Sequence, residues 1–498
     1  MMTTCPTCNK SFEPNEMKGD VCHLCYWKDR NGSTIADDEC LDDTTTTETA
    51  DDWPTLSDDA LCGWIGDFVR LATDHSEADP AAVLVTLLCR FAAEVGSAPY
   101  VNVGDARHRA RTNGIVVGDS SKSRKGTSGK PVERLFYSIP SGARCTPGPL
   151  SSGEGLIYAV RDEVKEFDKK LGEYVTTDPG VTDKRLFVLD EEFAAALNCT
   201  RREGNTLSAI IRGFYDDGNA EPLTKSTRIK ATGAHVSLIS HITKTELISL
   251  LNQVQMSNGF GNRFLWILAR RQRLIALPAP MPDRELESIR EIVVSRLNHA
   301  HNMQAVSMSN SATKLWIEAY PGLTMDYEGV AGSVVNRTEA HAIRLALIYA
   351  LCNGHRQIEV PDLLAAFAVV DYSRKSAFKI FGGAAGDKRK AQILDALRES
   401  PQGMSITEIS VLVFNRHVKS DDLQRMLNEM ELARLICREK VQTAGAPRTL
   451  IKLSSLCEKS ELSEISPITP PLNSLNSLNS HNEIKKYAWL NASDEVPL

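Results

Sequence analysis

A run of small and cationic residues after a short apolar stretch is the first feature of this chain that could carry chemistry. Residues 115–118 read as a buried strand that ends in a tight turn, and residues 119–128 as a loop leading into a helix. The amide groups and the positive dipole end of such a helix favour an anion. Lys125 adds a positive charge, and Thr127 or Ser128 offers a hydroxyl group to Mg²⁺. The pattern predicts a phosphate-binding loop for ATP.

The spacing departs from the standard phosphate-binding loop, in which four residues separate a glycine from Gly-Lys-Ser/Thr. Gly118 lies seven positions before Lys125, and Arg124 takes the place of the second glycine. Gly126 then separates the lysine from Thr127. The candidate nucleotide-binding residues are therefore Gly118, Arg124, Lys125, Gly126, Thr127 and Ser128.

A second segment carries the acidic groups that such a loop needs. Residues 186–189 are four apolar residues, a length that suits a central parallel strand, and Asp190 and Glu191 follow directly. Ligands of open α/β sheets bind at the carboxyl ends of the strands, so Asp190 could hold the metal of a bound nucleotide. The alternative is an ordinary buried strand followed by a polar turn. The order of loop and then acidic strand favours a protein driven by a nucleotide.

Other residues are candidates for the catalytic work itself. Glu154, between two glycines on what reads as an exposed turn, or Glu191 could orient an attacking water. Arg263 follows a glycine turn and could act as an arginine finger on a neighbouring subunit, although a structural arginine is equally plausible. His241 or Thr243, at the end of a β-patterned run, could sense the γ-phosphate, or could belong to a plain core strand.

Four cysteines near the N-terminus have the spacing of a zinc site. Cys5 and Cys8 form one pair, and Cys22 and Cys25 form a second pair thirteen residues further on. Four thiolates from two such turns complete a tetrahedral shell around Zn²⁺. We expect residues 1–31 to be a zinc ribbon whose folding depends on the metal, and the sequence does not choose between DNA, RNA and protein as its ligand.

Composition is that of an ordinary cytoplasmic protein. The 498 residues are 42% hydrophobic and 24% charged, with a net charge of −7. The most apolar runs, residues 81–88 and 343–351, are too short to span a bilayer, so we expect no membrane contact. The charge balance argues against a uniformly basic nucleic-acid coat, although a local basic surface remains open.

The chain then divides into an acidic linker and a large core. Residues 32–52 are rich in acids and threonine and read as a flexible linker, and residues 53–385 as the ATPase core. Asp79 and Pro80 open a predicted helix that runs to Val95.

Two strands and a basic turn are expected before the loop. Residues 100–103 and 113–117 read as strands, joined by a turn that holds Arg107 and Arg109 beside the nucleotide loop. Most such charges are simply solvated, but this turn could contact DNA or a neighbouring subunit.

Between the loop and the acidic strand we expect a helix and then a hairpin. The predicted helix carries Val160, Val164 and Phe167, and residues 169–175 read as the hairpin-like excursion.

The remainder of the core, residues 283–381, reads as helical. Arg337, His341 and Arg344 recur on one face of a helix rich in alanine and leucine. One of the arginines could close over a nucleotide, whereas ordinary ion pairs within the chain are the alternative.

Five motifs occur in order at residues 118–128, 151–155, 202–206, 258–263 and 337–351. Together they look like the uncharacterised-domain family of ATPases found on prophages, plasmids and integrated elements, whose members resemble the helicase half of primase-helicase proteins. The resemblance covers residues 53–383 and implies a RecA-like P-loop core, a homo-oligomer and a role in replicating mobile-element DNA. We expect single-stranded DNA to be the partner of this core.

The C-terminal part reads as a separate domain and a tail. Residues 386–455 have the pattern of three helices and a β-hairpin, which predicts a winged helix that could bind duplex DNA or protein. Residues 456–498 have the composition of a disordered tail, in which residues 484–490 could bind replication proteins. The candidate phosphate contacts of the winged helix are Arg416, Lys419, Arg425, Arg438, Lys440 and Arg448.

The sequence therefore predicts an α/β protein with a RecA-like P-loop NTPase core, an N-terminal zinc ribbon and a C-terminal winged helix, using ATP, Mg²⁺ and Zn²⁺. The leading hypothesis is an ATP-dependent helicase or helicase-like motor in the replication of a mobile element. A non-catalytic DNA-binding initiator or adaptor, and an anti-phage defence ATPase, are the alternatives.

Overall fold

The computed structural model describes residues 53–74, 76–118, 123–139, 142–222, 229–251, 258–327, 329–381, 388–432, 435–441 and 448–453, together with Tyr487 and four short strands near the N-terminus. All structural statements below concern these residues. The chain divides into two compact units, Met1–Trp53 and Pro54–Leu498, and each is described by itself.

The N-terminal unit contains two antiparallel pairs of two-residue strands. β1 (Thr3–Thr4) pairs with β2 (Ser11–Phe12), and β3 (Met17–Lys18) pairs with β4 (Val21–Cys22). The cysteines of the predicted zinc ribbon fall outside the described residues, except that Cys22 is placed as backbone of β4. The zinc site therefore stays a prediction for Cys5, Cys8, Cys22 and Cys25.

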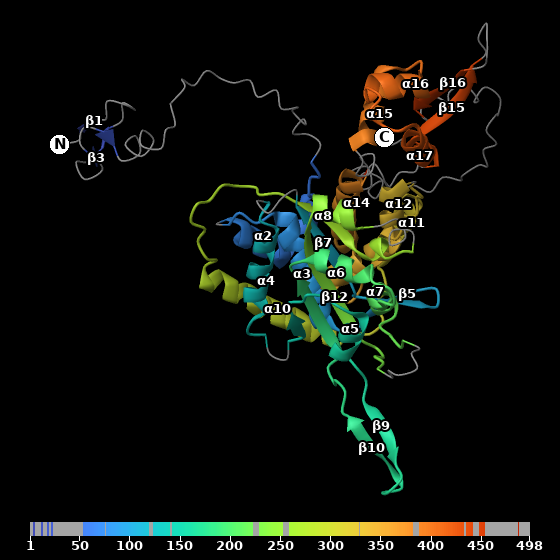
Figure 1. Cartoon of the computed structure of the whole chain (residues 1–498). Coiled ribbons are helices and arrows are strands. Elements are labelled where there is room, and N and C mark those ends of the chain that lie inside the picture. The colour runs from blue at the N-terminus through green and yellow to red at the C-terminus, as the bar shows by residue number, and fades with distance from the viewer. Residues whose placement is uncertain are drawn as a thin grey trace. The chain divides into compact units, whose positions relative to one another are not determined.

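The larger unit is built on a five-stranded parallel sheet, so the predicted α/β class is confirmed (Figure 1). The strands read as continuous apolar runs because helices cover both faces and every residue from 186 to 190 and from 265 to 269 is buried. In spatial order the strands are β13 (Leu265–Ala269), β7 (Asn113–Gly118), β12 (His235–Thr243), β11 (Arg185–Asp190) and β8 (Arg144–Thr146).

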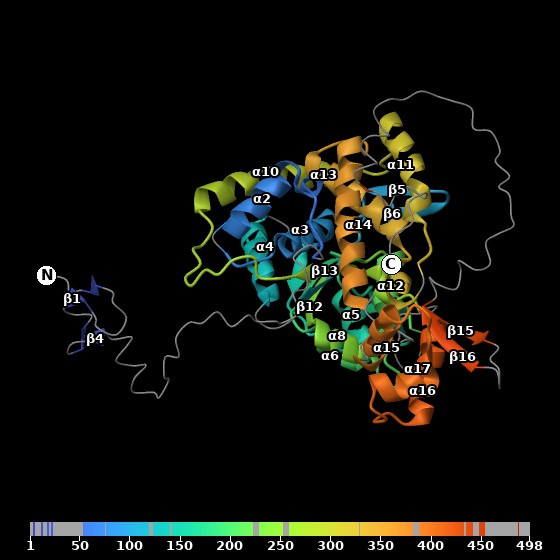
Figure 2. The same ribbon diagram turned by 90° about the horizontal axis from the view of Figure 1, so that it is seen from above.

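Helix α3 (Pro80–Val95) forms as predicted, and it packs across one face of the sheet. Asp79 caps its N-terminus by accepting from the amides of Ala81 and Ala82, and Pro80 has no amide hydrogen to leave unpaired. All residues from 81 to 95 are buried because further helices enclose α3 (Figure 2). These are α2 (Gly63–Asp74), α4 (Gly129–Phe136) and α10 (Asp283–His301).

Shorter helices cover the opposite face (Figures 1 and 2). Three of them contact the central strand β12, namely α6 (Phe193–Thr200), α7 (Leu207–Asp216) and α8 (Lys244–Leu250). α5 (Gly153–Ala159) packs on α7. The packing is close, because a Cβ on Gly153 would lie 2.3 Å from Oγ1 of Thr206.

The segment after the sheet is helical, as predicted for residues 283–381. α14 (Val360–Phe381) packs against β13 and against α13 (Thr338–Asn353). α11 (Asn310–Leu323) and α12 (Gly329–Val335) complete this layer. None of the described helices is both long and apolar enough to cross a membrane.

Two antiparallel hairpins correct the sequence-based assignment. The predicted basic turn is in fact strand β6 (Ala106–Arg109), which pairs with β5 (Tyr100–Val103). The helix predicted to carry Val164 and Phe167 ends earlier, at Ala159, and β9 (Val164–Asp168) pairs instead with β10 (Glu173–Asp178). Both errors concern short, charged segments, whose few residues do not distinguish a strand from a helix or a turn.

The C-terminal segment has its own apolar core. Its three-stranded antiparallel sheet has the order β14-β16-β15, formed by Met404–Ser405, Arg448–Leu453 and Ile436–Val441. The helical parts are α15 (Lys388–Glu399), α16 (Ile406–Glu408) with a π-helical turn at Ile409–Val413, and α17 (Ser420–Leu432). The three-residue spacing of Ser405 and Glu408 predicts a capping box, and both of its hydrogen bonds are formed.

Tyr487 is the one described residue beyond Leu453. Its ring is 4% exposed and belongs to the main core, and its hydroxyl donates to Oδ2 of Asp59 over 2.7 Å. Asp59 lies in the single 3₁₀ turn Asp58–Leu61 that precedes α2. A residue near the C-terminus thus packs against the start of the large unit.

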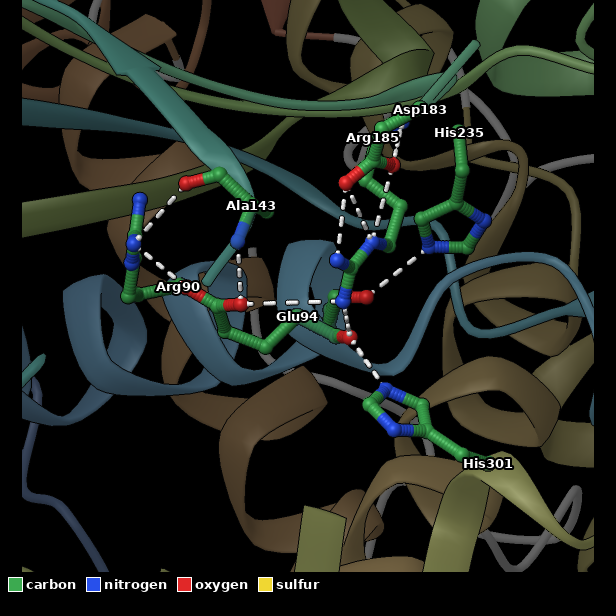
Figure 3. A network of polar contacts seen from close by, with 8 residues as sticks. Arg90, Glu94, Ala143, Asp183, Arg185, His235 and His301 are labelled. Atoms are coloured by element: carbon green, nitrogen blue, oxygen red, sulfur yellow. Dashed lines mark hydrogen bonds and ion pairs between the residues drawn. The ribbon is translucent and has the colours of Figure 1, made fainter. Parts of the chain in front are cut away.

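The edge at which the strands begin, here called the amino edge, contains a buried charge network (Figure 3). Glu94, 1% exposed, lies in ion-pair contact with Arg90 and accepts a 2.6 Å hydrogen bond from the Ala143 amide. Arg185, at the start of β11, lies 3.9 Å from the same carboxylate and pairs with Asp183 at 2.8 Å. Each charged group of this network has an opposite charge beside it.

Carbonyl groups in the last turn of α3 accept hydrogen bonds from side chains at the same edge. The Ala92 carbonyl accepts from Nε2 of His235 at 2.8 Å, and the Glu94 carbonyl accepts from Nη1 of Arg185 at 2.9 Å and from Nε2 of His301 at 2.8 Å. Terminal carbonyls of a helix have no partner within the helix, so side chains from two strands and from α10 complete α3 at this edge.

Candidate functional site

The predicted phosphate-binding loop begins where β7 ends. Gly118 is the last residue of β7, and residues 119–122 lie outside the described part of the chain. Arg124 adopts the left-handed backbone conformation with φ of 57°, and Lys125–Ser128 form one 3₁₀ turn that runs into α4. Left-handed non-glycine residues are uncommon and cluster at functional sites. The described turn at Lys125–Ser128 therefore leads into α4 at the predicted place.

The two candidate hydroxyl groups differ in availability. Ser128 is fully buried, and its hydroxyl donates to the Lys125 carbonyl over 2.7 Å. Thr127 is half-buried, and only its backbone amide is used, donating to the Arg124 carbonyl over 2.9 Å. A Cβ on Gly126 would meet nothing within 4 Å, so the turn is open on that side. This geometry favours Thr127 over Ser128 as the hydroxyl for a metal ion.

The buried carboxylate of Glu77 binds Arg124 of the loop. Nε of Arg124 donates to Oε2 of Glu77 over 2.6 Å, and the Ile275 amide donates to Oε1 over 3.0 Å. Glu77 is 5% exposed, and Arg271 lies 3.7 Å away. The Ile275 amide and then the Arg124 guanidinium hold the pKa of Glu77 below its usual range. Arg124 therefore fixes the backbone of the loop rather than pointing freely outward.

Asp190 ends β11 with an incompletely bonded carboxylate. Oδ1 accepts from the Glu192 amide at 3.1 Å, whereas Oδ2 is buried and has no hydrogen-bond partner among the described residues. Burial raises the pKa of Asp190, since a low-dielectric surrounding disfavours the charged form. The turn at Gly148 closes over it, because a Cβ there would lie 3.0 Å from Oδ1. A free carboxylate oxygen at a strand end suits a metal ion or its bound water.

His241, on β12, is the second buried group without partners at this edge. It is 2% exposed, and neither ring nitrogen has a hydrogen-bond partner within the described residues. Burial and then the positive charge of Lys125 lower the pKa of His241 to about 4, so the ring is neutral at pH 7. Lys125 also contributes to lowering the pKa of Glu246, after the hydroxyl and amide of Thr243. The loop cation is thus near the end of β12.

The loop and Asp190 are separated by one strand. β12 lies between β7 and β11, and no contact between Lys125 and Asp190 is found in the described part of the chain. Aligned residues of neighbouring strands face the same side. Leu189 aligns with Ile239 and faces α4, whereas Asp190 aligns with Ser240 and faces away. A ligand that contacts both Lys125 and Asp190 must therefore extend past the carboxyl end of β12.

The two candidates for orienting water differ in their surroundings. Glu154 lies in the first turn of α5, half-buried, and its Oε1 accepts from Oγ1 of Thr206 over 2.8 Å. The prediction of an exposed turn was wrong because Ser152 caps the helix one residue before Gly153. Glu191 is exposed directly after Asp190.

Arg263 is held within its own chain. The side chain is 9% exposed, and its Nη2 lies 2.7 Å from Oδ2 of Asp216, whose Oδ1 accepts from Nη1 of Arg337 at 2.9 Å. Nη1 of Arg263 also donates to the Gly259 carbonyl and to Asn262. This geometry favours the structural alternative over an arginine finger.

The predicted lid residues of α13 are likewise internal. His341 lies 3.2 Å from the Tyr215 hydroxyl and donates to the Asn262 carbonyl at 3.0 Å, and burial lowers its pKa to about 3. The Arg344 guanidinium lies 4.0 Å from the centre of the Tyr215 ring. Arg337, His341 and Arg344 therefore connect α13 to α7.

A cavity of about 330 Å³ lies beside the candidate site on the α3 side of the sheet. Gly129, Phe136, Phe187 and Leu189 are among the residues that line it. Its lining is mostly apolar, which does not suit a triphosphate. The polar groups at the strand ends, rather than this cavity, define the candidate site.

Sequence reasoning missed Glu77, Asp79 and Gly148 as parts of the site. Oδ2 of Asp79 accepts from the Arg270 amide and from Gln272, so Glu77 and Asp79 together hold the chain after β13. Asp79 was recognised only as a helix cap. Glu77, two residues earlier, gave no signal because its partners are distant in sequence.

No cluster of three or more histidine, cysteine or acidic side chains arranged for a metal ion occurs among the described residues. Compared with known proteins, the chain matches no family model and no curated protein.

Proposed function

We propose that the chain is an ATP-binding and ATP-hydrolysing motor of the RecA-like class that acts on DNA in the replication of a mobile element. The supporting observation is the pair of buried, partnerless groups at one sheet edge. Oδ2 of Asp190 and both nitrogens of His241 lack hydrogen bonds within the described residues, near the turn that carries Lys125. Unpaired buried polar groups are costly and call for an external partner.

The residues present fit Mg²⁺ and a triphosphate. Lys125 and the amides of its turn would bind phosphate oxygens, and Thr127 and Asp190 would hold the metal ion. When bound, Mg²⁺ would neutralise charge on the phosphates. Glu154 is held by Thr206 and Glu191 is free in water, so Glu154 is the better placed of the two to keep a water in one orientation.

The sheet order is also compatible with this proposal. One strand separates the loop strand β7 from the acidic strand β11, as in RecA-like cores. Neutral His241 at the tip of that strand would donate a hydrogen bond to a phosphate oxygen from one ring nitrogen. The contact of Arg263 with Asp216 holds this arginine within its own chain, so the proposal does not use it as an arginine finger.

The test is nucleotide binding and hydrolysis, with and without single-stranded DNA. We expect DNA-stimulated ATP hydrolysis, and a fall in kcat of about 100-fold or more for Lys125→Ala and for Asp190→Asn. Lys125→Ala should weaken nucleotide binding with or without Mg²⁺. Asp190→Asn should weaken it only in the presence of Mg²⁺.

Lys130→Ala is the matched control, because Lys130 is a lysine of α4 that pairs with Glu133 at 3.0 Å on the surface. Its turnover should stay within about twofold of wild type. Unaltered turnover in Lys125→Ala, or a wild-type chain that binds no nucleotide, would refute the motor.

A specific observation favours a second candidate, a DNA-binding initiator or adaptor. The elements from α15 to β16 follow the order of a winged helix, with α17 as third helix and β15–β16 as wing. Of the candidate phosphate contacts, Arg438 lies 3.3 Å from Glu431. The side chains of Arg425, Lys440 and Arg448 lie outside the described part.

Duplex binding by the full chain tests this candidate. The double variant Arg416→Glu with Lys419→Glu should weaken binding and lower the slope of log K against log salt by about 2. An unchanged slope would remove these residues from any DNA interface. A chain that binds duplex tightly but hydrolyses no ATP would favour the adaptor over the motor.

A further inference from the structure

The β9–β10 hairpin, here called the arm (residues 163–178), projects away from the sheet and its helices (Figure 1). Its base is firmly held. Arg161 binds Asp178 through two hydrogen bonds of 2.6 and 2.9 Å, and Nζ of Lys184 donates to Oδ1 of Asp162 over 2.8 Å. The arm therefore leaves the core in a fixed direction, and its outer part packs on nothing else in the chain that the structure describes.

One face of the arm is aromatic. Phe167 pairs with Tyr174 across the strands, with ring centres 5.4 Å apart in an edge-to-face arrangement. The two side chains are 53% and 72% exposed, and Leu171 at the tip is 65% exposed. An isolated two-stranded ribbon is marginally stable in water, and clustered exposed apolar groups mark contact surfaces. The arm thus exposes apolar groups of the kind found at contact surfaces.

The opposite face is acidic. Side chains alternate between the two faces, so Glu166, Asp168 and Glu173 share the face that the rings do not occupy. Asp168 and Glu173 stand directly opposite each other, an arrangement in which like charges destabilise a ribbon. None of the three has an ion-pair partner within the described residues. A cationic partner would remove this repulsion.

The β5–β6 hairpin, here called the cationic ribbon (residues 100–109), offers the complementary surface. The guanidinium carbons of Arg107 and Arg109 lie 4.7 and 5.5 Å from the centre of the Tyr100 ring. Burial and then the charge of Arg107 lower the pKa of Arg109. Neither arginine has a carboxylate partner in the described part of the chain. The ribbon carries unbalanced positive charge beside an aromatic ring.

The arm and the cationic ribbon of one chain point away from different parts of the large unit and do not reach each other (Figure 1). We propose that the arm of one copy docks on the cationic ribbon of a second copy, with its acidic face on Arg107 and Arg109. The contact joins two different surfaces, so it is head-to-tail and builds a ring or a filament. It does not depend on nucleotide chemistry.

The charge of the arm favours a protein partner over nucleic acid. Between Glu163 and Asp178 the arm has five carboxylates and three lysines. A polyanion would be repelled by this balance, whereas single-stranded nucleic acid is bound by aromatic residues set in a positive groove.

The test is the mass of the full chain in solution at low salt, without nucleotide. The arm variant combines Glu166→Lys with Glu173→Lys, which spares Asp168 because Asp168 accepts from the Lys170 amide at the tip. The ribbon variant combines Arg107→Glu with Arg109→Glu. Each variant alone should weaken association by about tenfold or more. An equimolar mixture of the two variants should associate again, because every contact then joins opposite charges.

A chain with all four substitutions should also associate, and circular dichroism would verify that each variant is folded. The matched control, Glu285→Lys with Glu291→Lys on the exposed side of α10, should keep the wild-type mass. A monomeric wild-type chain overturns the proposal. So do variants with wild-type mass, a mixture that stays dissociated, or a ribbon variant that loses only affinity for single-stranded DNA.

Discussion

The two edges of the central sheet treat their charged groups in opposite ways. At the amino edge, Glu94 lies against Arg90 and near Arg185, and the Ala92 and Glu94 carbonyls of α3 accept hydrogen bonds from side chains of other elements. At the carboxyl edge, Asp190 has no cation beside it in the described residues, and His241 has no hydrogen bond. The charges of the first edge face opposite charges within the chain, although Nε and Nη1 of Arg90 and Nδ1 of His235 have no hydrogen-bond partner among the described residues. The buried carboxylate of the second edge faces no cation there. We therefore expect stability to depend mainly on the ion pairs of the first edge, and the proposed function on the second.

Breaking the amino edge should have the largest effect. Glu94→Ala leaves Arg90, 9% exposed, as a buried charge without its carboxylate, and we expect a loss of about 3–5 kcal/mol of unfolding free energy. Urea unfolding of the large unit measures it. Adding Arg90→Met to Glu94→Leu should restore much of the loss. If Glu94→Ala unfolds like wild type, the contrast between the edges disappears.

Acid should act on the carboxyl edge through its buried histidine, in addition to His235 and His341, whose pKa values are also lowered by burial. The pKa of His241 in the fold, about 4, lies below its unfolded value near 6.5. Its contribution is therefore complete above pH 6.5 and lost as the pH falls toward 4, by up to about 3 kcal/mol. His241→Asn should flatten the fall in unfolding free energy over that range. An equally steep fall in the variant would mean that His341 and His235 account for it.

Weakening the contact between Glu77 and Arg124 should have an intermediate effect, which is confined to nucleotide binding. Glu77→Gln keeps the shape of the side chain but removes the charge that holds Arg124. We expect nucleotide affinity to fall by about tenfold, measured by titration calorimetry. Asp74→Asn is the control, since Asp74 lies in the same region and faces only Arg273 at 3.9 Å. Equal affinities for both variants would show that the Glu77 contact does not shape the loop.

The smallest expected effect is an increase in the unfolding free energy rather than a loss. Asp190 has its pKa raised by burial, so its ionised form destabilises the fold above the unfolded value near 3.9. Asp190→Asn should therefore raise the unfolding free energy at pH 7 by about 1 kcal/mol. The gain should vanish near pH 3, where both side chains are neutral. A destabilised variant at pH 7 would place Asp190 among the structural carboxylates, beside Glu94.

Local sequence patterns were sufficient to predict the elements that are decided by residues close together in the sequence. The apolar runs of β7 and β11, the Asp79-Pro80 start of α3 and the Ser405 capping box were all predicted, because each is decided by neighbours within a few residues. The sharp turn around Lys125 followed from the same kind of signal.

Features that depend on distant partners could not be predicted. Arg263 reads as a free finger after a glycine turn, and only the fold reveals Asp216 beside it. Glu77 gains its role from Arg124 and Ile275, both far along the chain. The arm was expected to begin as a helix, since Val160, Val164 and Phe167 have helical spacing, but Asp162 is bound instead to Lys184 and Thr232. Tertiary contacts there override local preference.

Tyr487 gives the last segment of the chain a part in the fold. Its ring fills a place in the main core, and its hydroxyl reaches Asp59, which is more than 400 positions away in sequence. A protein shortened after Leu453 would leave that space in the core open to water and would remove the hydrogen bond from the Tyr487 hydroxyl to Asp59. Removal of the C-terminal residues by a protease, or a C-terminal tag, would therefore perturb the turn Asp58–Leu61 before α2, which is far away in the sequence.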